Sequence, residues 1–374
     1  MPAVPGPEVA VFTPALLLFI EIHDDTDGRP DIHVHAGGQG FWMARMVQAL
    51  GATPIPCSPV GGEPGVALGA ILQAAGMPAR LSSSSRPNAV VVEDRRGGDR
   101  VELAVTEVPP LGRHEVDELY SAVVGAAIRA GVCLIAGTQL DPALRDDVFR
   151  RLVADLRRNG VLVIADLSGS ALRAALASGV DIIKISHEEL IRDGWAGGEG
   201  PDEVMEGIAR LRGAGAGAVV VSRSSRNSLA GFEHRLVEVH SPSLEVVDHR
   251  GGGDSMSAAL AVAAATGRSF EDGLRLAAAA GALNVSRQGL GSGRIDAIEE
   301  IADRVEVRDL RRDGRRAHPA TDERLTERSR RELYEMARHL DIGGRSTMSH
   351  DELVIAIGRA AGVARRAGAV VSPE

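Results

Sequence analysis

The chain has 374 residues, of which 44% are hydrophobic and only 3% aromatic, and it carries a formal net charge of −9. This length accommodates one large α/β domain, or one such domain with a small appendage. The acidic balance argues against nucleic-acid binding by the whole molecule, although not by a segment of it. Two cysteines provide neither a disulfide framework nor a metal-binding pattern, so we expect a reducing, cytoplasmic setting.

The first apolar run, residues 9–22, is short and is interrupted by Pro14. It therefore predicts a buried strand that leads into a second strand, and not a membrane span. No basic region with a cleavage site precedes it, so no secretory signal is expected. Glycines at 37 and 38 then precede a helix that is expected to end near Leu50.

The central part of the chain alternates between expected strands and helices. Residues 88–105 place two valine-rich stretches on either side of a charged turn, which is typical of a hairpin. Further on, strands are expected at 133–137, 161–166, 181–185 and 218–222, and helices at 147–159, 171–178 and 201–213. Such alternation predicts an α/β fold with a mostly parallel sheet and helices on both faces. Ligands of such sheets bind beyond the carboxyl ends of the strands.

The segment 246–256 contains two valines, three consecutive glycines and Asp254. The valines predict the end of a strand, and an alanine-rich helix is expected from about Ser255 to Thr266. A glycine turn that opens a helix offers free N–H groups and the positive end of the helix dipole, which suits a phosphate. A carboxylate there repels the phosphate unless it serves as a general base for an attacking hydroxyl. The alternative is a glycine-rich loop with an N-cap aspartate.

This segment resembles the D-T-x-G-A-G-D signature of the ribokinase/PfkB family of carbohydrate kinases, and most closely the G-A-G-D-S-M of its 1-phosphofructokinase branch. Asp248 matches the first aspartate and residues 251–256 match the rest, whereas His249 and Arg250 depart from the usual small residues. The resemblance extends from about residue 11 to residue 307. It implies a ribokinase-like fold that uses ATP and Mg²⁺, with a monovalent cation near Asp248. The implied catalytic base is Asp254, and the implied anion hole consists of Gly251, Gly252 and Gly253.

Residues 36–45 resemble the G-G-K-G-x-N-x-A-R signature of the same family, with two departures. Gln39 replaces a lysine that would meet a substrate phosphate, and Trp42 replaces an asparagine that would meet a sugar hydroxyl. Leu17 stands where the branch has an aspartate that binds sugar hydroxyls. Gln39 can still hydrogen-bond a hydroxyl, and Trp42 either offers a flat ring to a less polar acceptor or fills the pocket. The implied substrate-binding residues are Gly37, Gly38, Gln39, Trp42 and Arg86.

The resemblance also implies a small β lid formed by about residues 15–36 and 86–108. A lid of this kind covers the acceptor and excludes water, which suppresses hydrolysis of ATP. Arg86 matches a basic residue at the start of the lid hairpin, although an exposed, solvated arginine explains it equally well. Such lids often pair with a second subunit, so a homodimer through the lid is implied.

Residues 184–189 resemble the K-P-N-x-x-E motif of the family, which makes Glu189 the carboxylate that organises Mg²⁺ through water. The alternative is an ordinary glutamate at a helix start. Magnesium keeps several waters, so one carboxylate together with the ATP phosphates forms a sufficient site.

The nucleotide side departs further from the family pattern. Residues 219–228 stand in place of S-x-G-x-x-G, with Ser224 and Asn227 at the two glycine positions. Asparagine tolerates the left-handed conformation, so we expect Asn227 to preserve one turn. Residues 277–293 resemble the family segment that lies against the adenine, although an alanine-rich packing helix explains them too. The implied nucleotide-binding residues are Ser222, Arg223, Arg226, Asn284 and Gly289, with solvated surface arginines as the alternative for Arg223 and Arg226.

Beyond residue 307 the composition becomes arginine-rich. We expect a basic linker at 308–323, a module of two helices at 324–362 and a tail at 363–374. Ser349 is the expected N-cap of the second helix, with Glu352 at capping-box spacing. The module resembles the N-terminal helix-extension-helix domain of the Rho transcription terminator, whose relatives bind nucleic acid or proteins. A small docking or oligomer-tuning module is the alternative.

The leading interpretation is an ATP-dependent phosphotransferase with its kinase domain at 9–307, acting on a hydroxyl of a sugar, a sugar phosphate or a related metabolite such as a nucleoside. The departures at Leu17, Gln39 and Trp42 argue against fructose phosphates as good substrates. They also motivate the alternative, a catalytically impaired regulatory or scaffold protein that binds nucleic acid or protein through its C-terminal module. Retention of Asp254 favours the enzyme.

Overall fold

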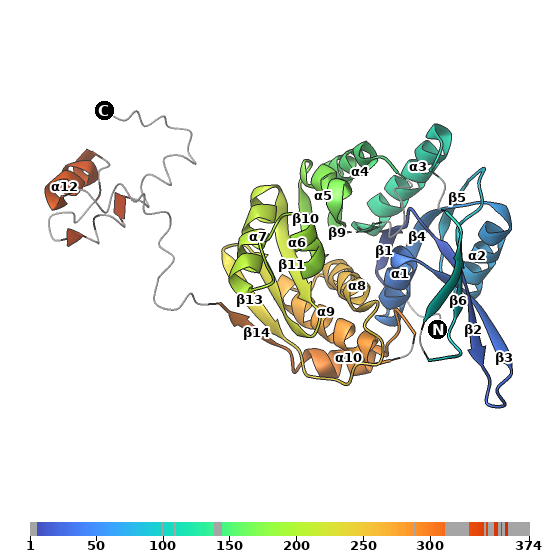
Figure 1. The fold of residues 1–374 in the computed structure, drawn as a ribbon. Coiled ribbons are helices and arrows are strands. Elements are labelled where there is room, and N and C mark those ends of the chain that lie inside the picture. The colour runs from blue at the N-terminus through green and yellow to red at the C-terminus, as the bar shows by residue number, and fades with distance from the viewer. Residues whose placement is uncertain are drawn as a thin grey trace. The chain divides into compact units, whose positions relative to one another are not determined.

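The computed structural model describes residues 6–98, 100–107, 110–137, 144–287, 289–310, 329–339, 342, 348–350, 353 and 356–357. The chain divides into two compact units, Met1–Asp309 and Leu310–Glu374. The larger unit contains both β-sheets (Figure 1). Among the described residues, no helix has both the length and the apolar character needed to span a bilayer.

The larger sheet has ten strands and confirms the predicted α/β fold. In spatial order they are β14 (Glu306–Asp309), β13 (Arg235–His240), β12 (Arg226–Phe232), β11 (Ala216–Arg223), β10 (Val180–Ser186), β9 (Leu162–Asp166), β8 (Val132–Ala136), β1 (Glu8–Phe12), β4 (Thr53–Val60) and β5 (Arg80–Ser83). The pairs from β11 to β5 are parallel, whereas β12, β13 and β14 continue the sheet in antiparallel fashion. The central strands are apolar and buried, as expected for a sheet covered on both faces.

The helices cover both faces of this sheet. One layer contains α1 (Gln39–Ala49), α8 (Gly252–Ala265), α9 (Phe270–Val285) and α10 (Ile295–Ala302), and the other contains α3 (Arg113–Ala130), α4 (Asp146–Arg158), α5 (Gly169–Leu176) and α7 (Pro201–Gly213). The short α6 (His187–Arg192) follows β10, and α2 (Gly62–Ala74) contacts β4 and the smaller sheet.

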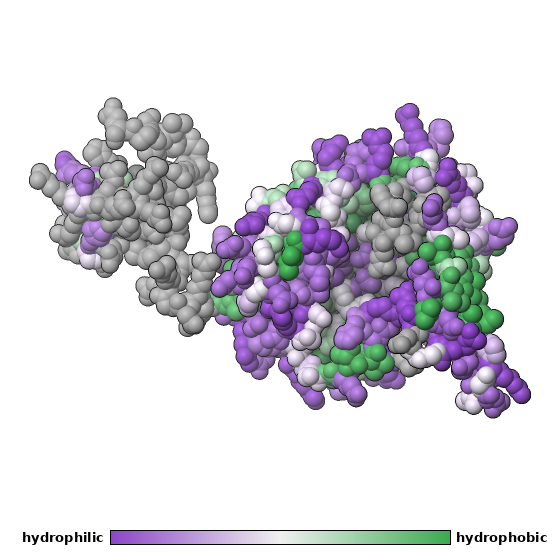
Figure 2. Space-filling view, in the orientation of Figure 1, coloured by the Kyte–Doolittle hydropathy of each residue, from purple (hydrophilic) through white to green (hydrophobic). Residues whose placement is uncertain are grey.

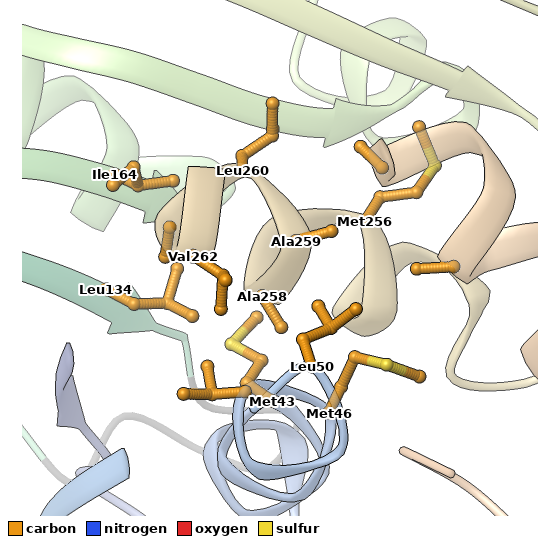
Figure 3. Packing of buried hydrophobic residues seen from close by; sticks show 14 of the residues in the cluster. Met43, Met46, Leu50, Leu134, Ile164, Met256, Ala258, Ala259, Leu260 and Val262 are labelled. Atoms are coloured by element: carbon orange, nitrogen blue, oxygen red, sulfur yellow. The ribbon is translucent and has the colours of Figure 1, made fainter. Parts of the chain in front are cut away.

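Helix α8 packs against α1, α9 and the central strands of the sheet, and it forms the centre of the core. Ala258 and Val262 of α8 point toward α1 and its Met43 (Figure 3), and all three side chains are buried. Gly281 of α9 allows the two helices to approach closely, since a Cβ built there would lie 2.9 Å from Met256 Cγ and 3.1 Å from Gly252 O of α8. This packing fixes the position of the N-terminus of α8.

The smaller sheet has four strands, in the order β3 (Pro30–Gly37), β2 (Leu17–Asp24), β6 (Val90–Asp94) and β7 (Val101–Val105). Strands β6 and β7 form the hairpin predicted from the valine pattern, with a register shift between Val92 and Glu93. The sheet is built from the two segments in which the lid was expected, although β3 extends one residue further, to Gly37.

Three local predictions were wrong. Val246 and Val247 form no strand, because the N–H groups of Val247 and Asp248 both donate to Val285 O at the end of α9, and the two valine side chains are exposed. Helix α8 begins at Gly252, not Ser255, so Asp254 lies inside its first turn. The left-handed residue of the β11–β12 turn is Ser224, with φ 52°, and not Asn227.

In the smaller unit, α12 (Arg330–His339) confirms part of the first predicted helix. Its N-terminus has a capping box that the sequence analysis missed, in which Glu332 N donates to Ser329 Oγ and Ser329 N donates to Glu332 Oε2. A small apolar core consists of Leu333, Ala337, Leu353 and Ile357. Most of the predicted linker, Glu352 and the tail lie outside the described residues.

Candidate active site

The N-terminus of α8 has the glycine-rich form of an anion-binding helix start. Gly251 is the N-cap in the left-handed conformation, with φ 72°, and Gly252, Gly253 and Asp254 form the first turn. The first N–H groups of a helix have no partner inside the helix, so they are available to a phosphate oxygen. A side chain at Gly251 would be strained, and its Cβ would lie 3.1 Å from Asn284 Nδ2. The predicted anion hole is therefore sterically open only because these residues are glycines.

Asp254 is the titratable residue of this turn, and the pKa of its carboxyl is strongly shifted. Burial raises the pKa of its carboxyl to about 7, and the nearby negative charges of Asp166 and Glu189 act in the same direction. Lys184 and the Gln39 side chain oppose this shift, because both stabilise the carboxylate. A carboxyl that titrates near neutral pH is well suited to accept a proton from a hydroxyl.

A buried ion pair that the sequence analysis missed lies close to this carboxyl. Lys184 Nζ is 3.1 Å from Asp166 Oδ2, and the two side chains are 6% and 4% exposed. The residues are register partners at the carboxyl ends of β10 and β9. Ser257 of α8 donates its hydroxyl to Asp166 over 2.7 Å. A partial sequence signal existed, because Asp166 is the last residue of the apolar strand β9 and Lys184 lies between isoleucines in β10.

Lys184 also lies directly behind the glycine turn. A Cβ built at Gly253 would collide with Lys184 Nζ, so only glycine leaves room for the ammonium group. Burial alone would lower the pKa of Lys184, but the charges of Asp166, Asp254 and Glu189 raise it above its ordinary value. The ammonium therefore stays protonated and adds positive charge behind the glycine turn.

Gln39, the first residue of α1, is held against the same carboxyl. Its Oε1 accepts a hydrogen bond of 2.7 Å from the backbone N–H of Gly137, which directly follows β8. With the oxygen engaged there, the side chain contacts Asp254 through its amide donor, which lowers the pKa of that carboxyl. The structure thus places this predicted substrate-binding residue beside Asp254.

Glu189 is fixed at the start of α6 by a capping box that the sequence analysis did not identify. Its Oε2 accepts hydrogen bonds from Ser186 N (3.1 Å) and Ser186 Oγ (2.9 Å), and Glu189 N donates to Ser186 Oγ. Its charge still reaches Lys184 and Asp254. Among the described residues, no three His, Cys, Asp or Glu side chains form a metal cluster. A single anchored carboxylate fits Mg²⁺ that is otherwise held by water and phosphate oxygens.

The predicted nucleotide-binding arginines are engaged with a neighbouring segment. Arg223 is buried and donates to Glu199 O (3.2 Å), and Arg226 pairs with the Glu199 carboxylate at 3.1 Å. Arg223 is therefore not a solvated surface arginine, whereas Arg226 lies at the surface with its side chain 49% exposed. Together they tie the β11–β12 hairpin, whose first strand contains Ser222, to the segment before α7.

Asn284 connects two loops beside the glycine turn. It is 1% exposed, its Nδ2 donates to Arg250 O over 2.7 Å, and its Oδ1 accepts from Gly291 N over 2.8 Å. The loop that contains Gly289, with φ 99°, and Gly291 is thereby held against the loop that leads into α8. The geometry gives Asn284 a supporting role in the shape of the site.

The acceptor side is more apolar than the family signature implies. Leu17 is buried with Ala89 and Val91. Trp42 is 8% exposed, and its ring lies 5.7 Å from that of His35, which favours the interpretation that it fills the pocket. A Cβ at Gly37 would lie 3.3 Å from Trp42, and one at Gly38 would lie 2.8 Å from Ala15 O.

Arg86 is separated from the other predicted substrate residues. Its side chain is exposed, and it lines a small pocket whose walls include Pro14, Ala15, Ser84 and Pro87 but neither Gln39 nor Trp42. The structure therefore does not place Arg86 beside Asp254.

The smaller sheet carries a network of charged side chains. Glu21 pairs with His23 at 3.1 Å and with His35 at 3.6 Å, and the hydrogen bond with His35 is the largest cause that lowers the pKa of Glu21 to about 2. Glu93 is fully buried and pairs with Arg100, and it lies 3.8 Å from Arg95. These charges reach the loop before α8, because the pKa of Arg250, raised chiefly by its hydrogen bond with Asp248, is raised further by Glu93 and Glu21.

Several solved structures share this architecture. Phosphofructokinase-2 from Escherichia coli in complex with potassium gives a TM-score of 0.71 at 23% identity, covering 80% of this chain and 99% of that chain. Arabidopsis thaliana ribokinase complexed with ribose and ATP gives a TM-score of 0.62 at 21% identity, covering 80% and 99%. These likenesses define the class to which the fold belongs, the ribokinase-like α/β proteins.

Sequence comparisons narrow this class to a family. The sequence model described as pfkB family carbohydrate kinase matches residues 17–297. ATP-dependent 6-phosphofructokinase isozyme 2 of Mycobacterium tuberculosis (strain ATCC 25618 / H37Rv) is 30% identical over 271 residues, covering 71% of this chain and 78% of that protein. Its namesake in Escherichia coli (strain K12) is 27% identical over 258 residues, covering 68% and 82%. The chain belongs to the pfkB family of carbohydrate kinases.

Proposed function

We propose that this protein transfers the γ-phosphoryl group of ATP, with Mg²⁺, to a hydroxyl that Asp254 deprotonates. The observation that carries the proposal is the position of Asp254 in the first turn of α8, next to free N–H groups, with its pKa raised to about 7 by burial. The base and the anion-binding groups are thus adjacent, as an in-line phosphoryl transfer requires.

The residues around Asp254 are proposed to bind the phosphoryl group, to hold the metal ion and to orient the base. The N–H groups of Gly252 and Gly253 bind the oxygens of the transferred phosphoryl group, and the Lys184 ammonium behind them adds positive charge. Glu189 would hold Mg²⁺ through water, and the ion would supply positive charge to the phosphates. Gln39 orients the Asp254 carboxylate while its own oxygen is held by Gly137 N.

For the acceptor we propose a neutral hydroxylated molecule, a sugar or a nucleoside, in preference to a sugar phosphate. The 6-phosphofructokinases among the relatives act, by their names, on a phosphorylated sugar. In this chain Gln39 carries no charge and is engaged by Gly137 N, while Leu17 is buried in an apolar cluster. Neither position therefore supplies the charged contact of the family signature. The comparisons give no support to the alternative of a scaffold protein.

The test is acceptor-dependent release of ADP from Mg-ATP, measured with matched pairs of sugars and their phosphates and with a set of nucleosides. Release with a neutral acceptor that clearly exceeds release with its phosphorylated partner is expected. Preferential use of the sugar phosphate would contradict the acceptor assignment. Absence of acceptor-dependent release throughout, together with no binding of Mg-ATP, would contradict the proposed kinase.

We further propose that two copies of the chain pair through the outer face of the smaller sheet. Ile32 and Val34 on the edge strand β3 are 61% and 54% exposed, and Val101 and Leu103 on the other edge strand are each 53% exposed. Figure 2 shows hydrophobic side chains gathered over this sheet. Exposed apolar edges of this kind are normally protected, and a second copy would cover them. A structure of the E. coli relative is described as a tetrameric inhibited form.

A further inference from the structure

Asp248 is the position at which the sequence resemblance implies a monovalent cation, and a relative has been crystallised in complex with potassium. A potassium ion is held by oxygen ligands that replace its hydration shell. An Asp248 carboxylate that served it would need an oxygen free of other cations. The side chains around Asp248 therefore decide whether such a site fits this chain.

Both carboxylate oxygens of Asp248 accept hydrogen bonds from Arg250. Arg250 Nε donates to Oδ1 over 3.0 Å and Nη2 donates to Oδ2 over 2.6 Å, while the backbone N–H of Arg250 adds a third hydrogen bond of 3.0 Å to Oδ1. This is the bidentate geometry in which a guanidinium binds a carboxylate most strongly. A cation on the same carboxylate would face a fixed like charge at contact distance.

The Asp248–Arg250 pair lies in the loop that leads into the glycine turn, so a cation bound there would influence the position of that turn. Asp248 N donates to Val285 O, Asn284 donates to Arg250 O, and the next residue, Gly251, is the N-cap of α8. The side chains of Asp248 and Arg250 are only 19% and 35% exposed. The guanidinium thus holds the loop before α8 in one conformation. Because this loop leads directly into the glycine turn, it also fixes the position of the N–H groups of that turn.

We propose that the Arg250 guanidinium is a built-in replacement for the monovalent cation, so that the nucleotide site of this protein forms without potassium. The motivating departure is in the sequence itself, because Arg250 stands where the family signature has a small residue. With a small residue there, the Asp248 carboxylate would be free to hold an ion. The inference rests on the proposed function only for the nucleotide-binding arm of its test.

The first arm is thermal unfolding of the full-length chain in potassium chloride and in choline chloride at equal ionic strength. The wild type should unfold at the same temperature in both salts. Arg250→Ala exposes Asp248, so potassium should raise its unfolding temperature by about 2 °C or more relative to choline. Arg294→Ala is the matched control, because Arg294 makes the same bidentate contact with Asp296 over 3.0 and 2.6 Å at an exposed site. It should show no difference between the salts.

The second arm is the affinity for Mg-ATP in the same two salts, measured by calorimetry. Wild-type affinity should agree within about twofold, whereas Arg250→Ala should lose about tenfold in choline and regain most of it in potassium. Stabilisation of the wild type by potassium, or an Arg250→Ala variant indifferent to potassium, would overturn the inference. If the alanine variant does not fold, Arg250→Gln takes its place with the same expectation. Failure of the wild type to bind Mg-ATP in either salt would count against the proposed function, while the unfolding arm still decides this inference.

Discussion

Lys184 and Asp166 form a buried ion pair, 3.1 Å long, at the carboxyl ends of two neighbouring parallel strands. The pair supports the glycine turn from behind, since Lys184 Nζ occupies the space in which a side chain at Gly253 would lie. It also sets the electrostatics of the candidate base, because Asp166 raises the pKa of Asp254 and Lys184 lowers it. The two charges that act most directly on Asp254 are thus supplied by strands β9 and β10 of the larger sheet.

Removing one member of this pair should be costly. Lys184→Met leaves Asp166 buried without its counter-charge, so we expect the free energy of unfolding to fall by about 3–5 kcal/mol. Urea denaturation measures the change. Arg158→Ala, which breaks an exposed pair with Asp155, should cost less than about 1 kcal/mol. In Lys184→Met/Asp166→Leu both charges are gone, so part of the lost stability should return, and a double variant no more stable than the single one would contradict this account.

The acidity of Asp254 predicts how its replacement affects stability. Its folded pKa of about 7 exceeds the ordinary value of 3.8, so the folded state binds the proton more tightly than the unfolded chain. The stability that this proton binding provides is present below pH 3.8 and is lost as the pH rises through about 7. Asp254→Asn should therefore gain stability relative to the wild type as the pH rises across this window.

Chemical denaturation at several pH values measures that difference. Asp296→Asn serves as a control of opposite sign, because Arg294 lowers the pKa of Asp296 to about 2. It should show no gain with rising pH. An Asp254→Asn variant whose relative stability does not change with pH would mean that the carboxyl titrates normally.

Gln39 should influence the pH at which activity rises on the acid side of the pH–rate profile, because its side chain stabilises the Asp254 carboxylate. The base acts as a carboxylate, so kcat/KM should rise with pH through about 7, the pKa of Asp254. Gln39→Leu removes a donor that stabilises the carboxylate, so the midpoint should move to higher pH. Gln48→Leu, on the same helix but bonded to Ala75 O at the surface, should leave the profile unchanged. An unshifted midpoint in Gln39→Leu would assign that residue to substrate binding alone.

The proposed pairing of two copies depends on the apolar edge of the smaller sheet. Val34→Asp places a charge among side chains that the partner would bury, so sedimentation should show a shift from dimer to monomer. Val66→Asp is the control, because Val66 is a single exposed valine on α2, 77% exposed. A wild type that sediments as a monomer, or a Val34→Asp variant that stays dimeric, would rule out this interface.

The sequence predicted most of the architecture because its signals are local. Glycines before a helix and apolar strands in alternation with helices located α1, α8 and the parallel sheet. It also predicted Asp254 as a base and its glycines as an anion hole from their residue types and spacing, and these roles stay predictions. The strand at Val246 and Val247 failed because β-branched residues indicate a strand only where a partner strand exists, and the N–H of Val247 bonds to Val285 O instead.

What the sequence did not reveal depends on contacts between distant residues. Asp166 and Lys184 are 18 positions apart, and their pairing follows only from the register of β9 with β10. Gln39 was expected to bind substrate, but its oxygen meets the N–H of Gly137, nearly a hundred residues away. The pairing of Arg250 with Asp248 is local, yet the motif alone gave no reason to expect it. The function of the C-terminal module stays a prediction.

The most direct test of the central claim compares wild type and Asp254→Asn in two measurements, acceptor-dependent ADP release and Mg-ATP binding. If Asp254 is the base, the substitution should lower turnover by about 10²–10⁴-fold, because a positioned base contributes that much. Mg-ATP affinity should be preserved or increased, since a negative charge beside the phosphates is removed. Turnover at the wild-type rate in Asp254→Asn would contradict the account.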